Sequence, residues 1–309
     1  MKNGFLRDLK ITDAICLAYC ILQIIYVLVF GIALEFRSKI LLVYLGCMAF
    51  SVACVLIRRK VNNPVVGFFT TLYPIILLIP FYEVSGYQIH TLFPHFFDRY
   101  ILAFESLIFP VHPTIWLQRF FQPLIVEWMM FGYTIYLILL PITTGWLYIT
   151  GKKVESEHML LSLCIAFFVC YFFFSLFPVE GPRYVLASQY SQPLKGYFFG
   201  VFAKRLEASA MLHGGAFPSA HCAAATVMLL LSYKYERKLF WWILPVIITL
   251  YVATVYGRYH YPSDAVAGIL VGIIAIQLSY PMLAAWDRIL VSAGYRIRGR
   301  VEGNSRVPL

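Results

Sequence analysis

Long apolar segments constrain the fold of this chain more than any other feature of its sequence. A helix needs about 20 consecutive apolar residues to cross the hydrocarbon core of a bilayer, and the chain contains eight runs of roughly that length. The sequence therefore predicts an all-α, polytopic membrane helix bundle with about eight transmembrane helices. The runs lie at about residues 12–34, 38–57, 64–85, 124–149, 158–177, 217–233, 239–256 and 262–285.

Composition supports the bilayer as the solvent of this chain. Apolar residues make up 61% of the 309 residues and charged residues only 13%, whereas soluble domains carry about 45–50% apolar and about 25% charged residues. In a soluble protein, the formal net charge of +10 would point to nucleic acid as a partner. Here the positions of the basic residues explain the charge, so the predicted partner is the lipid bilayer and not a nucleic acid.

The placement of lysine and arginine predicts the orientation of the chain. Cytoplasmic loops are enriched in both residues. If the N-terminus is cytoplasmic, 16 of the 25 basic residues fall in inner segments and nine in outer segments. The sequence thus predicts an integral membrane protein with both termini in the cytoplasm. The chain contains no Asn-x-Ser/Thr site, which favours a bacterial plasma membrane and leaves an internal eukaryotic membrane open.

Two of the predicted outer segments are too long to be tight connections. Residues 86–123 mix aromatic side chains with several histidines, and residues 178–216 contain a stretch around 195–212 in which basic and apolar side chains alternate. We expect each to contain an amphipathic helix that lies at the membrane interface. A plain loop is the alternative in both places.

Three polar segments that lie far apart in sequence are predicted to meet at one membrane face. The fifth apolar run ends before residues 178–183, the sixth begins within residues 213–221, and residues 257–264 join the last two runs. Ionisable residues that face a common space at helix ends are candidates for function. The topology therefore predicts one active site at the outer face, whether periplasmic, extracellular or luminal.

The middle polar segment is suited to anion binding at the start of a helix. Pro218 fits the first turn of a helix, because it has no N–H to leave unpaired. The backbone N–H groups of Ser219, Ala220 and His221 would then be unpaired at the positive end of the helix dipole. Ser219 could instead serve only as a helix cap, but a cap does not explain His221.

The third polar segment carries a histidine and a carboxylate at helical spacing. His260 and Asp264 are four residues apart, so the carboxylate can accept from one ring nitrogen and leave the other nucleophilic. A satisfied His–Asp pair at a helix start is the alternative. Arg183 and Arg258 add guanidinium groups, which offer phosphate oxygens a planar fork of donors. Together these residues predict a site that binds a phosphoryl group.

These segments resemble the motifs of the type 2 phosphatidic acid phosphatase superfamily. The tetrapeptide at 218–221, Pro-Ser-Ala-His, resembles the second motif, which usually reads Pro-Ser-Gly-His. Residues 256–264, which end in His-Tyr-Pro-x-Asp, resemble the third motif, and the segment that ends in Pro182-Arg183 resembles the first. The resemblance implies a membrane enzyme, a lipid phosphatase or phosphotransferase, with a catalytic core of six helices.

The resemblance also implies roles for single residues. His260 would be the nucleophile that forms a phosphohistidine, Asp264 would orient it, and His221 would protonate the leaving alcohol. The phosphoryl oxygens would be held by Arg183, Arg258, Ser219 and Ala220.

The family's helix count implies a division of the chain. The first motif of the family follows the third helix of the core, but here it follows the fifth apolar run. We therefore expect a two-helix N-terminal addition at 1–60, the six-helix catalytic membrane domain at 61–286 and a basic cytoplasmic tail at 287–309.

The motifs depart from the usual pattern in three places. Leu176 stands where the first motif has a lysine, and the usual Arg-Pro pair is reversed to Pro182-Arg183. Thr254 stands where the third motif has an arginine, so Arg258 would take over that role.

The segments 217–221 and 258–261 resemble most closely the inositol phosphorylceramide synthase-like branch, an inositolphosphotransferase branch that moves phospho-headgroups between lipids. The predicted substrate is a phospholipid or lipid phosphate, with an alcohol as a candidate acceptor; a plain lipid phosphate phosphatase is the alternative. No cofactor and no metal are expected, because two arginines and a helix N-terminus would neutralise the phosphoryl charge. The sequence shows no convincing carboxylate cluster for Mg²⁺.

Some further readings stay open. An intramembrane serine protease built on Ser219 would leave both arginines unexplained, and an anion transporter would place its polar residues near the membrane midplane. A vanadate-dependent haloperoxidase shares the pocket chemistry but is not expected to span a membrane eight times. The residues that remain as candidates for a headgroup or acceptor pocket are His213, Tyr184, Glu180, Asp98 and Glu127.

Overall fold

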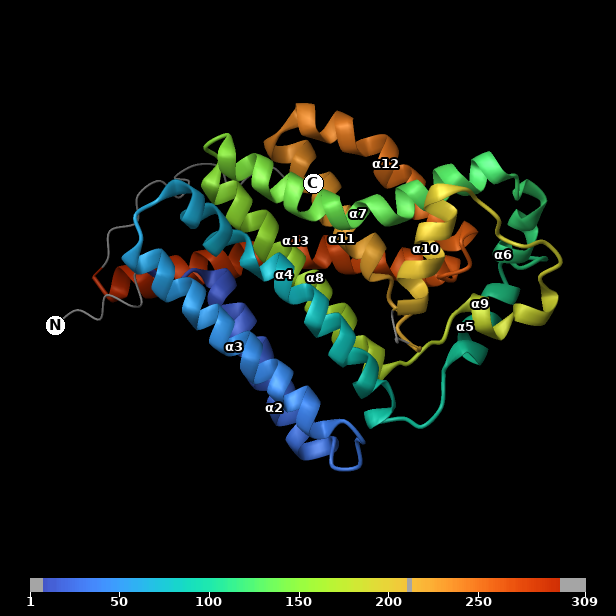
Figure 1. The fold of residues 1–309 in the computed structure, drawn as a ribbon, viewed down its shortest axis with the longest axis horizontal. Coiled ribbons are helices and arrows are strands. Elements are labelled where there is room, and N and C mark those ends of the chain that lie inside the picture. The colour runs from blue at the N-terminus through green and yellow to red at the C-terminus, as the bar shows by residue number, and fades with distance from the viewer. Residues whose placement is uncertain (1–7, 210–212, 295–309) are drawn as a thin grey trace.

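The structure is a computed structural model that describes residues 8–209 and 213–294, and these residues form helices and no strand. Seven of the helices are long and apolar enough to span a membrane. The all-α polytopic bundle is therefore confirmed (Figure 1). These helices are α2 (Ile11–Phe30), α3 (Arg37–Lys60), α4 (Pro64–Gln88), α7 (Pro123–Ile149), α8 (Lys153–Leu176), α12 (Arg237–Tyr256) and α13 (Pro262–Ser292).

The eighth predicted transmembrane helix is shorter than the others. α11 (Ala220–Tyr235) has 16 residues, which corresponds to about 24 Å at 1.5 Å per residue and is less than the roughly 30 Å of a hydrocarbon core. It begins after Ser219, because residues 217–219 belong to the loop that precedes it. α11 packs against α8, α12 and α13 and is buried over most of its length.

Two glycines of α13 allow it to approach α11 closely. A Cβ added at Gly272 would lie 2.6 Å from the carbonyl oxygen of Ala223, and one added at Gly268 would overlap the carbonyl oxygen of Ser219. Helix backbones in membranes come closest where such small residues meet. The first turns of α11 and α13 therefore lie side by side, and the backbone N–H of Ser219 donates to the carbonyl oxygen of Asp264 at 3.0 Å.

The N-terminal hairpin of α2 and α3 packs directly on the rest of the bundle (Figure 1). Tyr19 of α2 stacks on Phe168 of α8, with ring centroids 4.0 Å apart. The side chain of Gln88, at the end of α4, accepts from Tyr44 of α3 at 2.9 Å and donates to Gln23 of α2 at 3.1 Å. These buried contacts join α2 and α3 to the helices that follow.

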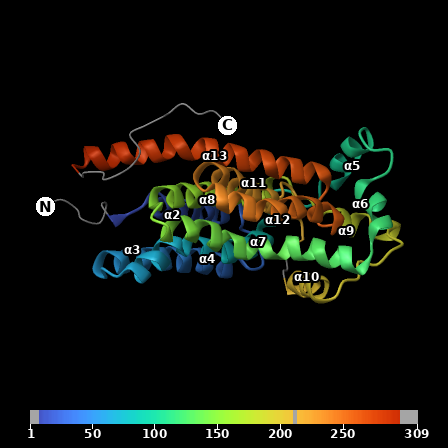
Figure 2. The same cartoon turned by 90° about the horizontal axis from the view of Figure 1, so that it is seen from above.

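Short helices gather at one end of the bundle, on the right in Figure 1. They supply helical structure in both long segments in which the sequence predicts interfacial helices, although residues 210–212 of that prediction lie outside the described residues. α10 packs against α7 (Figure 2). The short helices are α5 (Asp98–Ser106), α6 (Pro113–Trp116), η2 (Leu117–Phe120), α9 (Pro182–Val185), η3 (Ala187–Gln189) and α10 (Phe198–Ser209).

Candidate active site

The first and second polar segments pair through their backbones. The N–H of Val179 donates to the carbonyl oxygen of Gly214 at 3.1 Å, and the N–H of Ala216 donates to the carbonyl oxygen of Val179 at 3.0 Å. Gly214 has φ of 104°, and a Cβ there would lie 2.7 Å from Cγ2 of Ile89. A residue with a side chain could not take this position without strain. The loop that precedes α11 is thereby fixed against the loop that carries Arg183.

His260 is positioned by this pair of loops. Its ring nitrogen Nδ1 lies 2.8 Å from the carbonyl oxygen of Ala216, an acceptor that requires a proton on Nδ1. The other nitrogen, Nε2, then carries the lone pair of the neutral ring. The imidazole is almost fully buried, with 5% of the residue exposed. The structure therefore presents the tautomer that a nucleophilic histidine needs.

The acceptor for His260 differs from the one that the sequence predicts. Oδ2 of Asp264 lies 3.8 Å from Nδ1 of His260, which is too far for a hydrogen bond. The same oxygen accepts from the backbone N–H of Tyr261 at 2.8 Å, so Asp264 caps the first turn of α13. Asp264 supplies a nearby negative charge, while a backbone carbonyl fixes the ring.

His221 faces His260 from the start of α11. The two imidazole rings have centroids 5.7 Å apart and meet at 63°. One face of His221 stacks on Tyr133 of α7, with centroids 4.5 Å apart and planes at 20°, and Tyr136 packs nearby at 4.4 Å. The aromatic rings hold His221 beside the predicted nucleophile, and one substrate atom could contact both imidazoles.

The start of α11 offers fewer anion-binding groups than the sequence predicts. Ser219 is fully buried, its Oγ accepts from the N–H of Cys222 at 3.3 Å, and its own N–H donates to Asp264. The expectation that the Ser219 N–H is unpaired was wrong, because α13 approaches close enough to accept it. Within the described part of the chain, the N–H groups of Ala220 and His221 remain as the unpaired donors of this first turn.

Arg183 extends the aromatic stack that begins at His221. Tyr259 stacks on Tyr133 with ring centroids 4.2 Å apart and planes at 12°, and the guanidinium carbon of Arg183 lies 5.4 Å from the centre of the Tyr259 ring. Burial raises the pKa of Tyr259 to about 12, so this phenol stays neutral at physiological pH. Arg183 and His221 therefore contact the same pair of stacked rings, Arg183 through Tyr259 and His221 through Tyr133.

Arg258 points toward another part of the same end of the bundle. Its Nη2 donates to the carbonyl oxygen of Gln192 at 2.6 Å, and its guanidinium lies over the ring of Tyr190 at 3.8 Å. Burial lowers the pKa of Arg258 below its ordinary value, and the charge of Arg183 nearby acts in the same direction. The backbone turns sharply here, with φ of 66°. These contacts brace the segment that follows η3.

Three of the candidate pocket residues form a cluster, and two do not join it. Nδ1 of His213 lies 3.6 Å from Oε1 of Glu180, and its ring packs on Tyr184 with centroids 4.4 Å apart. Asp98 is buried, and its carboxylate accepts from the backbone N–H groups of Glu180 and Gly181. Glu127 accepts the backbone N–H groups at the start of α10, including that of Phe199 at 2.6 Å.

Several groups that contribute to the site were not predicted from the sequence. The carbonyl of Ala216 carries no sequence signal, because every residue has one. Tyr133 and Tyr259 lie among many aromatic residues, so nothing distinguishes them in the sequence. Glu105 has a signal that could have been read, since it follows Asp98 by seven residues and therefore shares a helix face with it.

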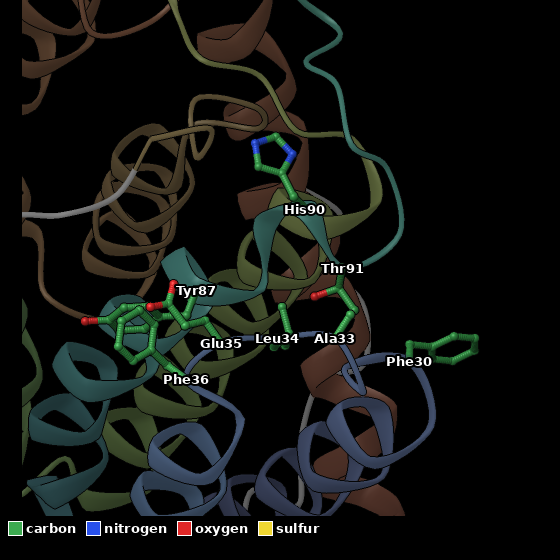
Figure 3. Close-up of a pocket in the computed structure, with 8 residues that line it drawn as sticks. All are labelled: Phe30, Ala33, Leu34, Glu35, Phe36, Tyr87, His90 and Thr91. Atoms are coloured by element: carbon green, nitrogen blue, oxygen red, sulfur yellow. The ribbon is translucent and has the colours of Figure 1, made fainter.

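The pocket drawn in Figure 3 lies away from these residues. It has a volume of about 350 Å³ and is found where the α2–α3 connection meets the end of α4. None of its lining residues belongs to the predicted site. The lining residues are Phe30, Ala33, Leu34, Glu35, Phe36, Tyr87, His90 and Thr91.

In residues 8–209 and 213–294, no three His, Cys, Asp or Glu side chains form a group that could hold a metal ion.

Comparison with known proteins identifies the family. Neither a curated protein nor a solved structure matches the chain. A family model described as the PAP2 superfamily matches residues 99–278, a span that covers more than half of the chain and includes all three polar segments. The chain belongs to the PAP2 superfamily.

Proposed function

We propose that this protein transfers a phosphoryl or phospho-headgroup from a lipid phosphoester through a covalent intermediate on His260. Membership of the PAP2 superfamily supports a phosphatase-type enzyme that acts on lipid phosphoesters in a bilayer. The observation that carries the finer proposal is the 2.8 Å contact between Nδ1 of His260 and the Ala216 carbonyl oxygen. It leaves Nε2 as the nucleophile, beside His221 as the acid.

The reaction takes place in two displacement steps. In the first, Nε2 of His260 attacks phosphorus, the bond from phosphorus to the leaving oxygen breaks, and protonated His221 gives its proton to that oxygen. In the second, water or an alcohol attacks the phosphohistidine, the N–P bond breaks, and His221 takes the proton of the attacking oxygen. Charge on the phosphoryl oxygens is stabilised by positioned donors.

We assign the phosphoryl oxygens to Arg183 and to the N–H groups of Ala220 and His221. Arg183 contacts Tyr259, whose ring stacks on the same Tyr133 that packs against His221. Arg258 adds positive potential and holds the segment after η3, while Ser219 acts as the cap that orients the first turn of α11.

A transferase related to the inositol phosphorylceramide synthase-like branch is the favoured form of this function, and a plain phosphatase is the alternative. Glu180 and Tyr184 lie in the first polar segment with Arg183, and His213 contacts both from the second; this cluster supports binding of a headgroup or acceptor hydroxyl. We place the site at the outer face of a bacterial plasma membrane, with both termini in the cytoplasm. The buried, capping hydroxyl of Ser219 does not favour a serine protease.

Purified protein in lipid micelles tests this function. It is incubated with labelled phosphatidic acid or phosphatidylinositol, with and without ceramide as acceptor and with and without EDTA. A new labelled lipid means transfer, and free phosphate or a free phospho-headgroup means hydrolysis. We expect activity to persist in EDTA, and its complete loss would contradict the metal-free mechanism.

Matched variants assign the chemistry to the two histidines. We expect wild-type protein quenched in alkaline denaturant to carry an acid-labile, base-stable label at His260. His260→Ala should abolish both label and turnover, and His221→Ala should slow both steps by about 10²–10⁴-fold. The control is His95→Ala, which removes an exposed histidine outside the site. Undiminished labelling of the His260→Ala protein would reject the proposal.

A further inference from the structure

Helix α5 has a buried face that carries two carboxylates. Asp98, Ile101 and Glu105 are its buried residues, and their spacing places them on one side of the helix. A helix at the surface of a bundle normally turns its charged residues to solvent. Buried carboxylates are costly unless donors surround them, so the groups that they contact are informative.

Asp98 links the first polar segment to the third. Its Oδ2 accepts from the backbone N–H of Glu180, and its Oδ1 accepts from the backbone N–H of Gly181, both at 2.8 Å. Oδ1 also accepts from the hydroxyl of Tyr261 at 2.9 Å. Gly181 lies two residues before Arg183 and Tyr261 directly follows His260, so one carboxylate connects the segments that carry the phosphate-binding arginine and the nucleophile.

Glu105 holds the start of α13. Its Oε1 accepts from both the backbone N–H of Ser263, at 2.8 Å, and the hydroxyl of Ser263, at 2.6 Å. Its Oε2 lies 3.0 Å from Nε2 of His112, whose ring packs against Tyr261. A carboxylate is favourable at a helix N-terminus, where the dipole is positive. Ser263 directly precedes Asp264, so this contact sets the position of the turn that carries His260.

Ile101, between the two carboxylates, packs where all three polar segments meet. It forms a buried apolar cluster with Val179 of the first segment, Ala216 of the second and Tyr261 of the third. Ala216 is the residue whose carbonyl oxygen orients His260. One face of α5 therefore contacts each segment of the site within a few residues of a proposed reacting group.

We propose that Asp98 and Glu105 are positioning residues that set the distance between Arg183 and His260. The proposal rests on the proposed function for the identity of the reacting groups. Neither carboxylate touches the substrate; each acts through the backbone that it binds. Bonds from N–H donors to a carboxylate are short and strong, and a small misplacement of reacting groups costs about 10²-fold in rate.

Variants that keep the shape of each side chain test this role. Asp98→Asn and Glu105→Gln each replace one acceptor oxygen by an NH₂ group, and Tyr261→Phe removes only one of the three bonds to Asp98. Ser106→Ala, on the exposed side of α5, is the matched control. For each protein, kcat, KM for a short-chain lipid phosphate, the inhibition constant of inorganic phosphate and the thermal unfolding temperature are measured.

A positioning role predicts a split among these quantities. We expect kcat to fall about 10–100-fold in Asp98→Asn and Glu105→Gln, with phosphate inhibition and lipid phosphate binding both weakened by a smaller factor, whereas Ser106→Ala changes none of these quantities. The kcat of Tyr261→Phe should lie between those of Ser106→Ala and Asp98→Asn. If Asp98→Asn does not fold, Tyr261→Phe tests the role of Asp98 in its place. Variants with a lower unfolding temperature but wild-type kcat and phosphate inhibition would overturn the proposal.

A readout without turnover separates this inference from the proposed function. If wild-type protein is inactive on every lipid phosphate, the proposed function fails, but the position of His260 can still be measured. The rate at which diethyl pyrocarbonate modifies His260 is followed by mass spectrometry. A changed rate in Asp98→Asn and Glu105→Gln, with the wild-type rate in Ser106→Ala, supports positioning, and equal rates in all four proteins contradict it.

Discussion

At the scale of single residues, the site depends on which group accepts the proton of His260. A backbone carbonyl fills this role at Ala216, while the carboxylate of Asp264 lies 3.8 Å away and binds the Tyr261 N–H. A carbonyl cannot be removed by substitution, so the tautomer of His260 is protected from change at position 264. The carboxylate contributes through its charge, which stabilises positive charge on the ring during the reaction.

This division of roles predicts unequal effects of two substitutions. Asp264→Asn keeps an oxygen that can accept from Tyr261 but loses the charge, so we expect kcat to fall about 10²–10³-fold, as for the loss of one positioned electrostatic contact. His260→Ala removes the nucleophile, and we expect a loss greater than about 10⁴-fold. Steady-state kinetics on the same lipid phosphate compare them. Equal losses in the two variants would mean that Asp264, and not Ala216, holds the ring.

The limits of prediction from sequence are also visible at single residues. The positions of His221 and His260 at helix starts were enough to predict that they meet, because the number of membrane crossings between them fixes the side. The contact between His260 and Ala216 spans 44 residues and uses a backbone atom, so no side-chain pattern could reveal it. Asp98 was a candidate for a headgroup pocket, but α5 buries it and its carboxylate accepts from the backbone N–H groups of Glu180 and Gly181.

At the scale of elements, the active site depends on how closely α11 and α13 pack. α11 has only 16 residues, and the helices around it bury most of its surface. The apolar run predicted this helix, but its start depends on the pairing of Val179 with Gly215, which apolar periodicity does not encode. The glycines of α13 let the two first turns meet, and these turns carry His221 and Asp264.

A methyl group at this interface should disturb both stability and activity. A Cβ at Gly268 would overlap the backbone of Ser219, so we expect Gly268→Ala to destabilise the protein by about 1–3 kcal/mol and to lower kcat by moving His221. Thermal unfolding in detergent and turnover measure the two effects.

The matched control is Gly46→Ala in α3, where an added Cβ meets nothing within 4 Å. Alanine is the better helix former, so this variant should equal the wild type or exceed its stability by up to about 1 kcal/mol. If Gly268→Ala behaved like Gly46→Ala, the close packing of α11 on α13 would be wrong.

At the scale of the whole molecule, the three polar segments meet at one end of a helix bundle, and the short helices α5, α6, α9 and α10 cover the same end (Figure 1). Alternating helix direction predicts this meeting from sequence. It does not predict that α2 and α3 share buried contacts with α4 and α8, because apolar runs do not indicate their partners. The domain boundary at residue 60 therefore stays a prediction, and the buried contacts continue across it.

The orientation of the chain in the membrane can be tested, because two exposed residues lie at opposite ends of the bundle. Ser188 lies in η3 beside the candidate site, and Lys238 lies in the first turn of α12, next to the predicted inner loop. The seven native cysteines are all buried, so they should react slowly with a membrane-impermeant maleimide. With the N-terminus inside, we expect Ser188→Cys to be labelled in intact cells and Lys238→Cys only after permeabilisation. Labelling in the reverse order would place the candidate site in the cytoplasm, and the charge bias of the loops would then need another explanation.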